Sequence, residues 1–146
     1  MVQTEMLAPA ATLVVWTLIV LVWLLVSRLR ALKQAGIEVK DLPPGNRGVN
    51  FEGKLPDKVM WKSHNYSHLT EQPTLFYATA IILSLAGASR LDIGLAWAYV
   101  VLRIVHSLWQ GNVNVITIRG PIFAAATLCL AVLAIRALLG TLGVSA

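Results

Sequence analysis

The sequence predicts an all-α fold, in which residues 1–146 form one domain built as an integral membrane four-helix bundle. The chain is 57% hydrophobic and 13% charged, with a mean hydropathy of +0.70, whereas soluble domains are about a quarter charged. Its apolar residues form long continuous runs rather than the alternating pattern of barrel strands. Such runs cross a membrane as helices, because a helix satisfies its own backbone hydrogen bonds in lipid.

The first span is expected over residues 7–27, which is long enough to cross a hydrocarbon layer of about 30 Å. Glu5 precedes this run, and Arg28 and Arg30 follow it. A cleaved signal peptide has its positive charge before the apolar core, so we expect this helix to be retained. Because Arg28 and Arg30 are two residues apart, they lie on different faces, and one can point into the bundle while the other meets lipid headgroups.

Most basic residues lie between the first and second apolar runs. The positive-inside rule therefore places this segment in the cytoplasm and both chain termini outside. The basic residues are not clustered with aromatic ones on a soluble surface, so we expect no nucleic-acid binding. Of the twelve Lys and Arg residues, this segment holds Arg28, Arg30, Lys33, Lys40, Arg47, Lys54, Lys58 and Lys62.

Residues 36–57 are predicted to form a long loop on the cytoplasmic side. The segment Pro43-Pro44-Gly45-Asn46-Arg47-Gly48 has consecutive prolines and two glycines, which do not hold a helix. The loop is longer than a simple connector, and this length allows it to fold over the cytoplasmic mouth of the bundle.

Three further spans complete the bundle, at about residues 69–88, 93–110 and 121–142. Pro73 falls in the first turns of the second span, where a missing backbone N–H is tolerated. Only a few residues separate the second and third spans, which makes them antiparallel neighbours. Arg136 is close enough to the outer end of the last span to reach the membrane surface by snorkelling.

A polar stripe runs along the third span. Tyr99, Arg103, His106 and Gln110 follow one another at spacings of four, three and four residues, so they share one helical face. Polar side chains in a membrane helix seldom face lipid. We therefore expect this face to point into the bundle or a water-filled cleft.

A second stripe enters the second span with the same spacing, at His64, His68, Glu71 and Leu75. Chain direction puts Glu71 at a depth similar to that of Arg103. An ionised group inside the membrane is seldom kept without a partner or a task, so we expect the two side chains to meet. They would form either a structural ion pair between helices or part of a site for an anionic polar ligand that enters from the cytoplasm.

The sequence offers little for a metal site. His64 and His68 are spaced as a possible ligand pair that His106 could join, but there is no HExxH or CxxC motif and no second acid nearby. We therefore predict no metal. Cys129 is the only cysteine, so an intrachain disulfide is impossible.

Several segments occur in a recognisable order: Asn65, Glu71-Gln72-Pro73, Leu75-Phe76-Tyr77, Arg103-Ile104-Val105-His106-Ser107 and Arg119-Gly120-Pro121-Ile122-Phe123. In this combination, and in its order of spans over residues 5–142, the chain resembles the family of membrane-associated proteins in eicosanoid and glutathione metabolism (MAPEG), in its bacterial branch. The resemblance implies a homotrimer of four-helix subunits. It also implies glutathione as a substrate, bound between neighbouring subunits near the cytoplasmic side.

The resemblance also assigns roles to single residues. Arg30 resembles the arginine at the end of the first helix, Glu71 the acid that binds the amino group of glutathione, and Arg103 the third-helix arginine. Arg119 resembles the catalytic arginine that stabilises the thiolate, because a guanidinium makes a thiol with a pKa of about 8.5 a better nucleophile. The other expected glutathione ligands are Asn65, His68, His106 and Gln110.

The chain departs from the enzymatic pattern of this family at several positions. His68 stands where the transferases usually have asparagine, and Gln110 where they have a tyrosine beside the thiol. Lys62 and His64 only partly replace an arginine expected before the acid. Gln110 can donate a hydrogen bond to a thiolate, but it has no phenolic proton.

The resemblance implies a multi-pass protein, expected in the bacterial inner membrane, that carries out glutathione-dependent transfer or peroxide reduction. Its second substrate would be a lipophilic electrophile that arrives from the membrane lipids. A non-catalytic lipid- or ligand-binding member of the same fold is an alternative. A small proton-coupled exporter is another, although the long loop and the off-centre position of Glu71 argue against it.

Overall fold

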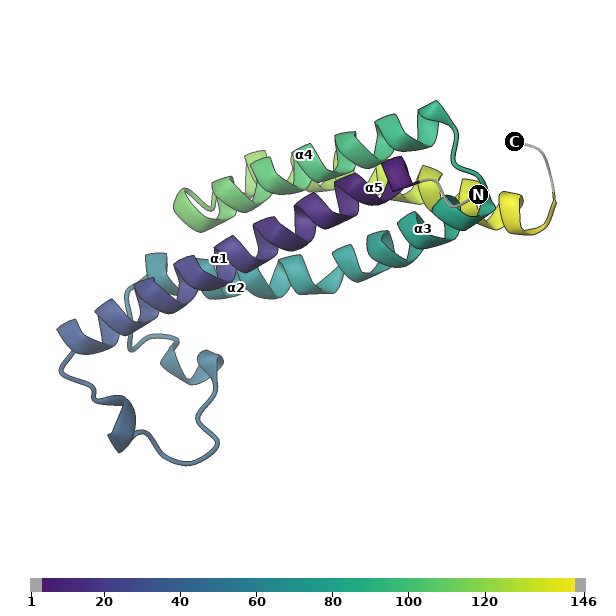
Figure 1. The fold of residues 1–146 in the computed structure, drawn as a ribbon. Coiled ribbons are helices and arrows are strands. Elements are labelled where there is room, and N and C mark those ends of the chain that lie inside the picture. The colour runs from purple at the N-terminus through teal and green to yellow at the C-terminus, as the bar shows by residue number, and fades with distance from the viewer. Residues whose placement is uncertain (1–3, 144–146) are drawn as a thin grey trace.

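The computed structural model describes residues 4–143, and it confirms the predicted all-α bundle. After a 3-10 turn at Thr4–Met6, the helices are α1 (Leu7–Gln34), α2 (Asp57–Glu71), α3 (Pro73–Ala86), α4 (Arg90–Asn112) and α5 (Ile116–Thr141). No strand occurs among the described residues. Figure 1 shows the helices side by side, with the loop between α1 and α2 at one end and both ends of the described chain at the other.

Helices α2 and α3 form one continuous rod, so the bundle has four rods. Gln72 joins them with right-handed helical angles (φ −61°, ψ −38°), and Pro73 begins α3. A proline removes one backbone hydrogen bond, but its fixed φ suits the first position of a helix. Three helical segments are long and apolar enough to cross a membrane, namely Thr4–Gln34, Arg90–Asn112 and Ile116–Thr141.

The rods pack in a pattern that chain order alone does not give. The short turn after α3 makes α3 and α4 antiparallel, as expected. However, α3 packs mainly against α5, and it is α2 that packs against α4. In the interior, the rings of Phe76 and Tyr99 stack with centroids 4.4 Å apart. Outside, α1 exposes large apolar side chains to lipid or to a neighbouring chain, as a membrane helix does. They include Val15, Leu18, Ile19 and Val22.

The long loop folds back on the ends of α1 and α2. Its Phe51 and Leu55 are buried with residues from both helices. The Nη2 atom of Arg28 donates to Ser63 Oγ at 2.9 Å, and its guanidinium lies 5.9 Å from the centre of the Phe51 ring. Arg30 is exposed instead. The prediction that these two arginines face different ways is therefore confirmed, with Arg28 as the inward one.

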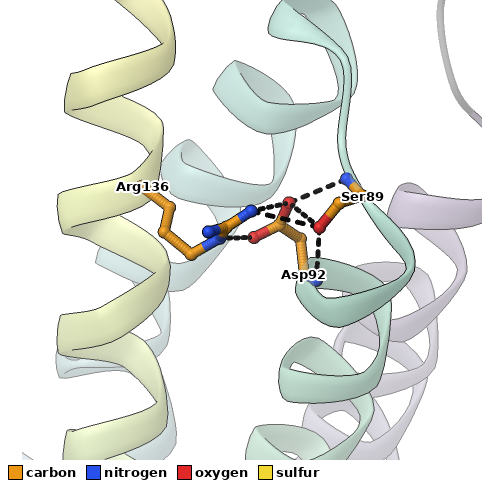
Figure 2. A network of polar contacts seen from close by, with 3 residues as sticks. All are labelled: Ser89, Asp92 and Arg136. Atoms are coloured by element: carbon orange, nitrogen blue, oxygen red, sulfur yellow. Dashed lines mark hydrogen bonds and ion pairs between the residues drawn. The ribbon is translucent and has the colours of Figure 1, made fainter. Parts of the chain in front are cut away.

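An ion pair closes the end of the bundle opposite the loop (Figure 2). Asp92 is 2% exposed and accepts hydrogen bonds from the backbone N–H of Ser89 at 2.7 Å and its hydroxyl at 2.8 Å. The guanidinium of Arg136 binds the same carboxylate through Nε and Nη2. The expectation that Arg136 reaches the membrane surface stays a prediction, and its guanidinium pairs with the buried Asp92 at this end of the bundle.

Candidate functional site

A polar cavity lies where α2, α4 and α5 meet, beside the turn that joins α4 to α5. Its volume is about 260 Å³. Helix α2 contributes one histidine, α4 a histidine and a glutamine, and α5 the remaining wall. Its lining residues are His68, His106, Gln110, Ile116, Arg119, Gly120 and Phe123. Four residues predicted to form the site thus meet around one space.

The polar stripe of α4 faces inward, as predicted. Tyr99 and Arg103 are completely buried, and His106 and Gln110 are 4% and 5% exposed. The Tyr99 hydroxyl donates to Gln72 Oε1 at 3.4 Å, which ties the stripe to the α2–α3 rod. By contrast, Val105 on the opposite face of α4 is exposed.

Arg103 lies behind the cavity and holds one of its walls. Its Nη2 donates to the backbone oxygen of His68 at 2.6 Å, and its Nη1 lies 3.4 Å from His68 Nδ1. The guanidinium is also 5.5 Å from the centre of the Phe123 ring, within the range of a cation–π contact. Arg103 therefore fixes the position of His68 and does not line the cavity itself.

The predicted ion pair between Glu71 and Arg103 is wrong for the described residues. The pairs found among residues 4–143 are Lys40–Glu38, His64–Glu52 and Arg136–Asp92, and Glu71 is exposed. The reason is rotation about the helix axis. Asn65 and Leu69 mark the buried face of α2, and with about 3.6 residues per turn Glu71 points roughly 120–160° away from them.

The other predicted residues also lie outside the cavity. Arg30 is exposed near the end of α1. Asn65 is 1% exposed and lies beside Gly111, and neither its oxygen nor its nitrogen has a hydrogen-bond partner among residues 4–143. The cavity of one chain therefore gathers only part of the predicted glutathione site.

Arg119 lines the cavity from the first turns of α5. It is half-buried, and its Nη1 donates to Asn114 Oδ1 at 2.5 Å. Asn114 adopts a left-handed backbone conformation (φ 58°) in the turn before α5, which asparagine tolerates better than most residues. A guanidinium has five N–H donors, so Arg119 retains donors for a ligand.

Sequence reasoning missed the aromatic wall of the cavity. The Phe123 ring lies 4.9 Å from that of His68 and 5.8 Å from that of His106. Its spacing from Arg119, four residues along one helix, was the available signal. No three His, Cys, Asp or Glu side chains within residues 4–143 group as metal ligands would. His64 does not line the cavity and pairs with Glu52 at 3.0 Å.

The fold and the cavity together define a helical membrane protein with an arginine, two histidines and a glutamine around a polar space between its helices. The model of the MAPEG family matches residues 6–139. The chain therefore belongs to the MAPEG family, as the ordered motifs predicted, and it is an integral membrane protein. No curated protein and no solved structure matches it.

Proposed function

We propose that this protein is a membrane-bound glutathione-dependent transferase or peroxidase, in which Arg119 stabilises the glutathione thiolate. The observation that carries the proposal is the position of Arg119 on the cavity wall, together with His68, His106 and Gln110. A guanidinium next to a thiol favours the thiolate, which is the reactive nucleophile. In transfer, the sulfur would form a bond to an electrophilic carbon while the leaving group departs with its electron pair.

A second cavity supports a lipophilic co-substrate. It lies between α3 and α5, and its volume of about 400 Å³ is in the range of small-molecule sites. Apolar side chains dominate its lining, which comprises Gln72, Leu75, Ala78, Thr79, Thr127, Leu130, Ala131 and Ala134. A molecule dissolved in the bilayer would meet this surface without crossing water.

The two cavities follow each other along the same pair of rods. His68 and Phe123 line the polar cavity, whereas Gln72 and Thr127, each one helical turn further on, line the apolar one. The side chain of Gln72 donates to Thr127 Oγ1 at 2.9 Å. A thiolate in the first cavity and an electrophile in the second would therefore be neighbours.

The proposal includes a homotrimer in which a neighbouring chain completes the site. The polar cavity holds one guanidinium and no carboxylate, and its volume is below the range of about 300–1,000 Å³ for ligand sites. Arg30 and Glu71 are exposed on the single chain and are available to a neighbour. Mixed oligomers test this: Glu71→Gln and Arg119→Ala chains, each inactive alone, should regain part of the activity when co-expressed. No recovery would mean that both residues act within one chain.

The direct test is glutathione binding to the detergent-solubilised protein, measured with the ultraviolet absorbance of the bound thiolate. We expect binding with thiolate formation, and loss of the thiolate signal in Arg119→Ala. Arg90→Ala is the matched control, because Arg90 is exposed at the other end of the bundle. Absence of binding at millimolar glutathione would refute the proposal. Binding without thiolate would favour the non-catalytic ligand-binding alternative.

A further inference from the structure

The contacts of Arg103 indicate which ring nitrogen of His68 carries the proton. A guanidinium carries only donors and stays charged, so the contact of 3.4 Å between Arg103 Nη1 and His68 Nδ1 requires an unprotonated Nδ1. A proton on Nδ1 would instead place two N–H groups against each other, and an imidazolium would also bring two cations together. This contact favours a neutral His68 with its proton on Nε2.

The second hydrogen bond makes this arrangement rigid. Arg103 Nη2 donates to the backbone oxygen of the same histidine at 2.6 Å, so the guanidinium holds both the main chain and the ring. Arg103 is completely buried, and its side chain has little room to move. The His68 ring also lies near the rings of His106, at 5.0 Å, and Phe123, at 4.9 Å.

We propose that His68 acts as a neutral hydrogen-bond donor, through Nε2–H, to the anionic atom of the ligand in the polar cavity, and that Arg103 is the residue that positions it. This inference rests on the proposed function, and it gives His68 the task of a donor to the thiolate. In this tautomer His68 cannot act as the general base for the thiol, because an Nε2 atom that already carries a proton cannot accept another.

The surroundings of the cavity suit a ligand that also carries a donor. Gln110 is 95% buried, and its Oε1 has no hydrogen-bond partner among residues 4–143. A buried acceptor without a partner is costly. His68 and Arg119 would thus bind the anionic atom, while Gln110 accepts an N–H or O–H of the same ligand. A thiolate with an amide N–H nearby, as in a cysteinyl peptide, meets this requirement.

The first test reads the tautomer directly and needs no glutathione. The chain has three histidines, so nitrogen NMR of the histidine-labelled protein shows three rings, and His68→Gln identifies the ring of interest. We expect the neutral Nε2–H form at pH 7. The titratable groups that face His68 are Arg103 and His106 from α4 and Arg119 from α5, with Glu71 on its own helix. An Nδ1–H tautomer or an imidazolium at pH 7 would overturn the inference.

Arg103→Met tests the positioning role. In a variant that keeps its helix content by circular dichroism, both tautomers of His68 should become populated. A pure Nε2–H form would show that Arg103 does not set the tautomer. Where this variant does not fold, the wild-type spectrum still decides the tautomer, and the His68 variants below decide the donor role.

The second test concerns the donor itself. His68→Gln retains an N–H donor, whereas His68→Leu removes it. We expect His68→Leu to raise the pH midpoint of thiolate formation by about one unit, the size of one lost charge-assisted hydrogen bond, and His68→Gln to shift it by less than half as much. An unchanged midpoint in His68→Leu, with glutathione still bound, would overturn the inference. Wild-type protein that binds no glutathione would refute the proposed function and leave the tautomer to the NMR result.

Discussion

Replacing Gly111 with alanine should destabilise the bundle, although alanine is normally the better residue in a helix. Gly111 lies near the end of α4, next to Gln110 of the polar cavity. A Cβ atom added there would be 2.8 and 2.9 Å from atoms of the Trp23 indole on α1 and 3.4 Å from Asn65 Nδ2. The Trp23 ring also has a cation–π contact with Lys62, whose Nζ lies 4.9 Å from the ring centre. The methyl group therefore has to displace a packed side chain.

Gly94 provides the matched control on the same helix. A Cβ atom added at Gly94 would meet nothing within 4 Å. Both substitutions gain the same helix propensity, about 1 kcal/mol, so this contribution cancels when the two variants are compared. What remains is the cost of overpacking at Gly111, about 1–3 kcal/mol.

The measurement is unfolding of the two variants in mild detergent. We expect Gly111→Ala to be less stable than Gly94→Ala by about 1–3 kcal/mol, which for a chain of this size lowers the melting temperature by roughly 2–4 °C per kcal/mol. Trp23→Leu in the Gly111→Ala background should recover part of the loss, because it removes the ring that the methyl group strikes. Equal stability of the two glycine variants would refute the close contact between α1 and α4.

Two other contacts give sharp expectations. Asp92→Ala should destabilise the protein by about 1.5–3 kcal/mol, because it removes the charged acceptor that Arg136 and Ser89 share. In a double-mutant cycle, Arg136→Met should cost less in that background than in the wild type; strictly additive losses would contradict the ion pair. Ser63→Ala removes the hydrogen-bond acceptor of Arg28 and should lower the free energy of unfolding by about 1 kcal/mol. It should also speed limited proteolysis within residues 36–57. An unchanged cleavage rate would show that this contact does not hold the loop.

The inward face of α4 could be predicted from the sequence because it depends on one helix alone. The spacings from Tyr99 to Gln110 define a face from helical geometry, and composition then decides which face avoids lipid. Arg119 was predicted from the family motifs, and His68 from its place in the second polar stripe. Phe123 completes it, and its place four residues after Arg119 would have sufficed to include it.

The rotation of α2 could not be predicted in this way. Chain direction gives the depth of Glu71 in the membrane, but it does not give the direction in which the side chain points around the helix. That direction follows from the burial of Asn65 and Leu69, which depends on the packing of α2 against its neighbouring helices. The α2–α3 rod also changes its neighbour along its length, because α2 packs against α4 whereas α3 packs against α5. No local sequence pattern predicts this change.

The predicted ion pair of Glu71 with Arg103 is wrong, and the pair that buries a carboxylate between helices, Asp92 with Arg136, was not predicted from the sequence. Asp92 is the third residue of α4, and the Ser89–Asp92 capping box anchors its short side chain to the start of the helix. The capping contacts hold the carboxylate independently of Arg136, so forming the pair restricts fewer additional side-chain rotations. Glu71 has a longer side chain, no such cap and an outward direction on its rod. An acid near a helix start with a capping serine is thus a better candidate for a buried ion pair than an acid at matched depth.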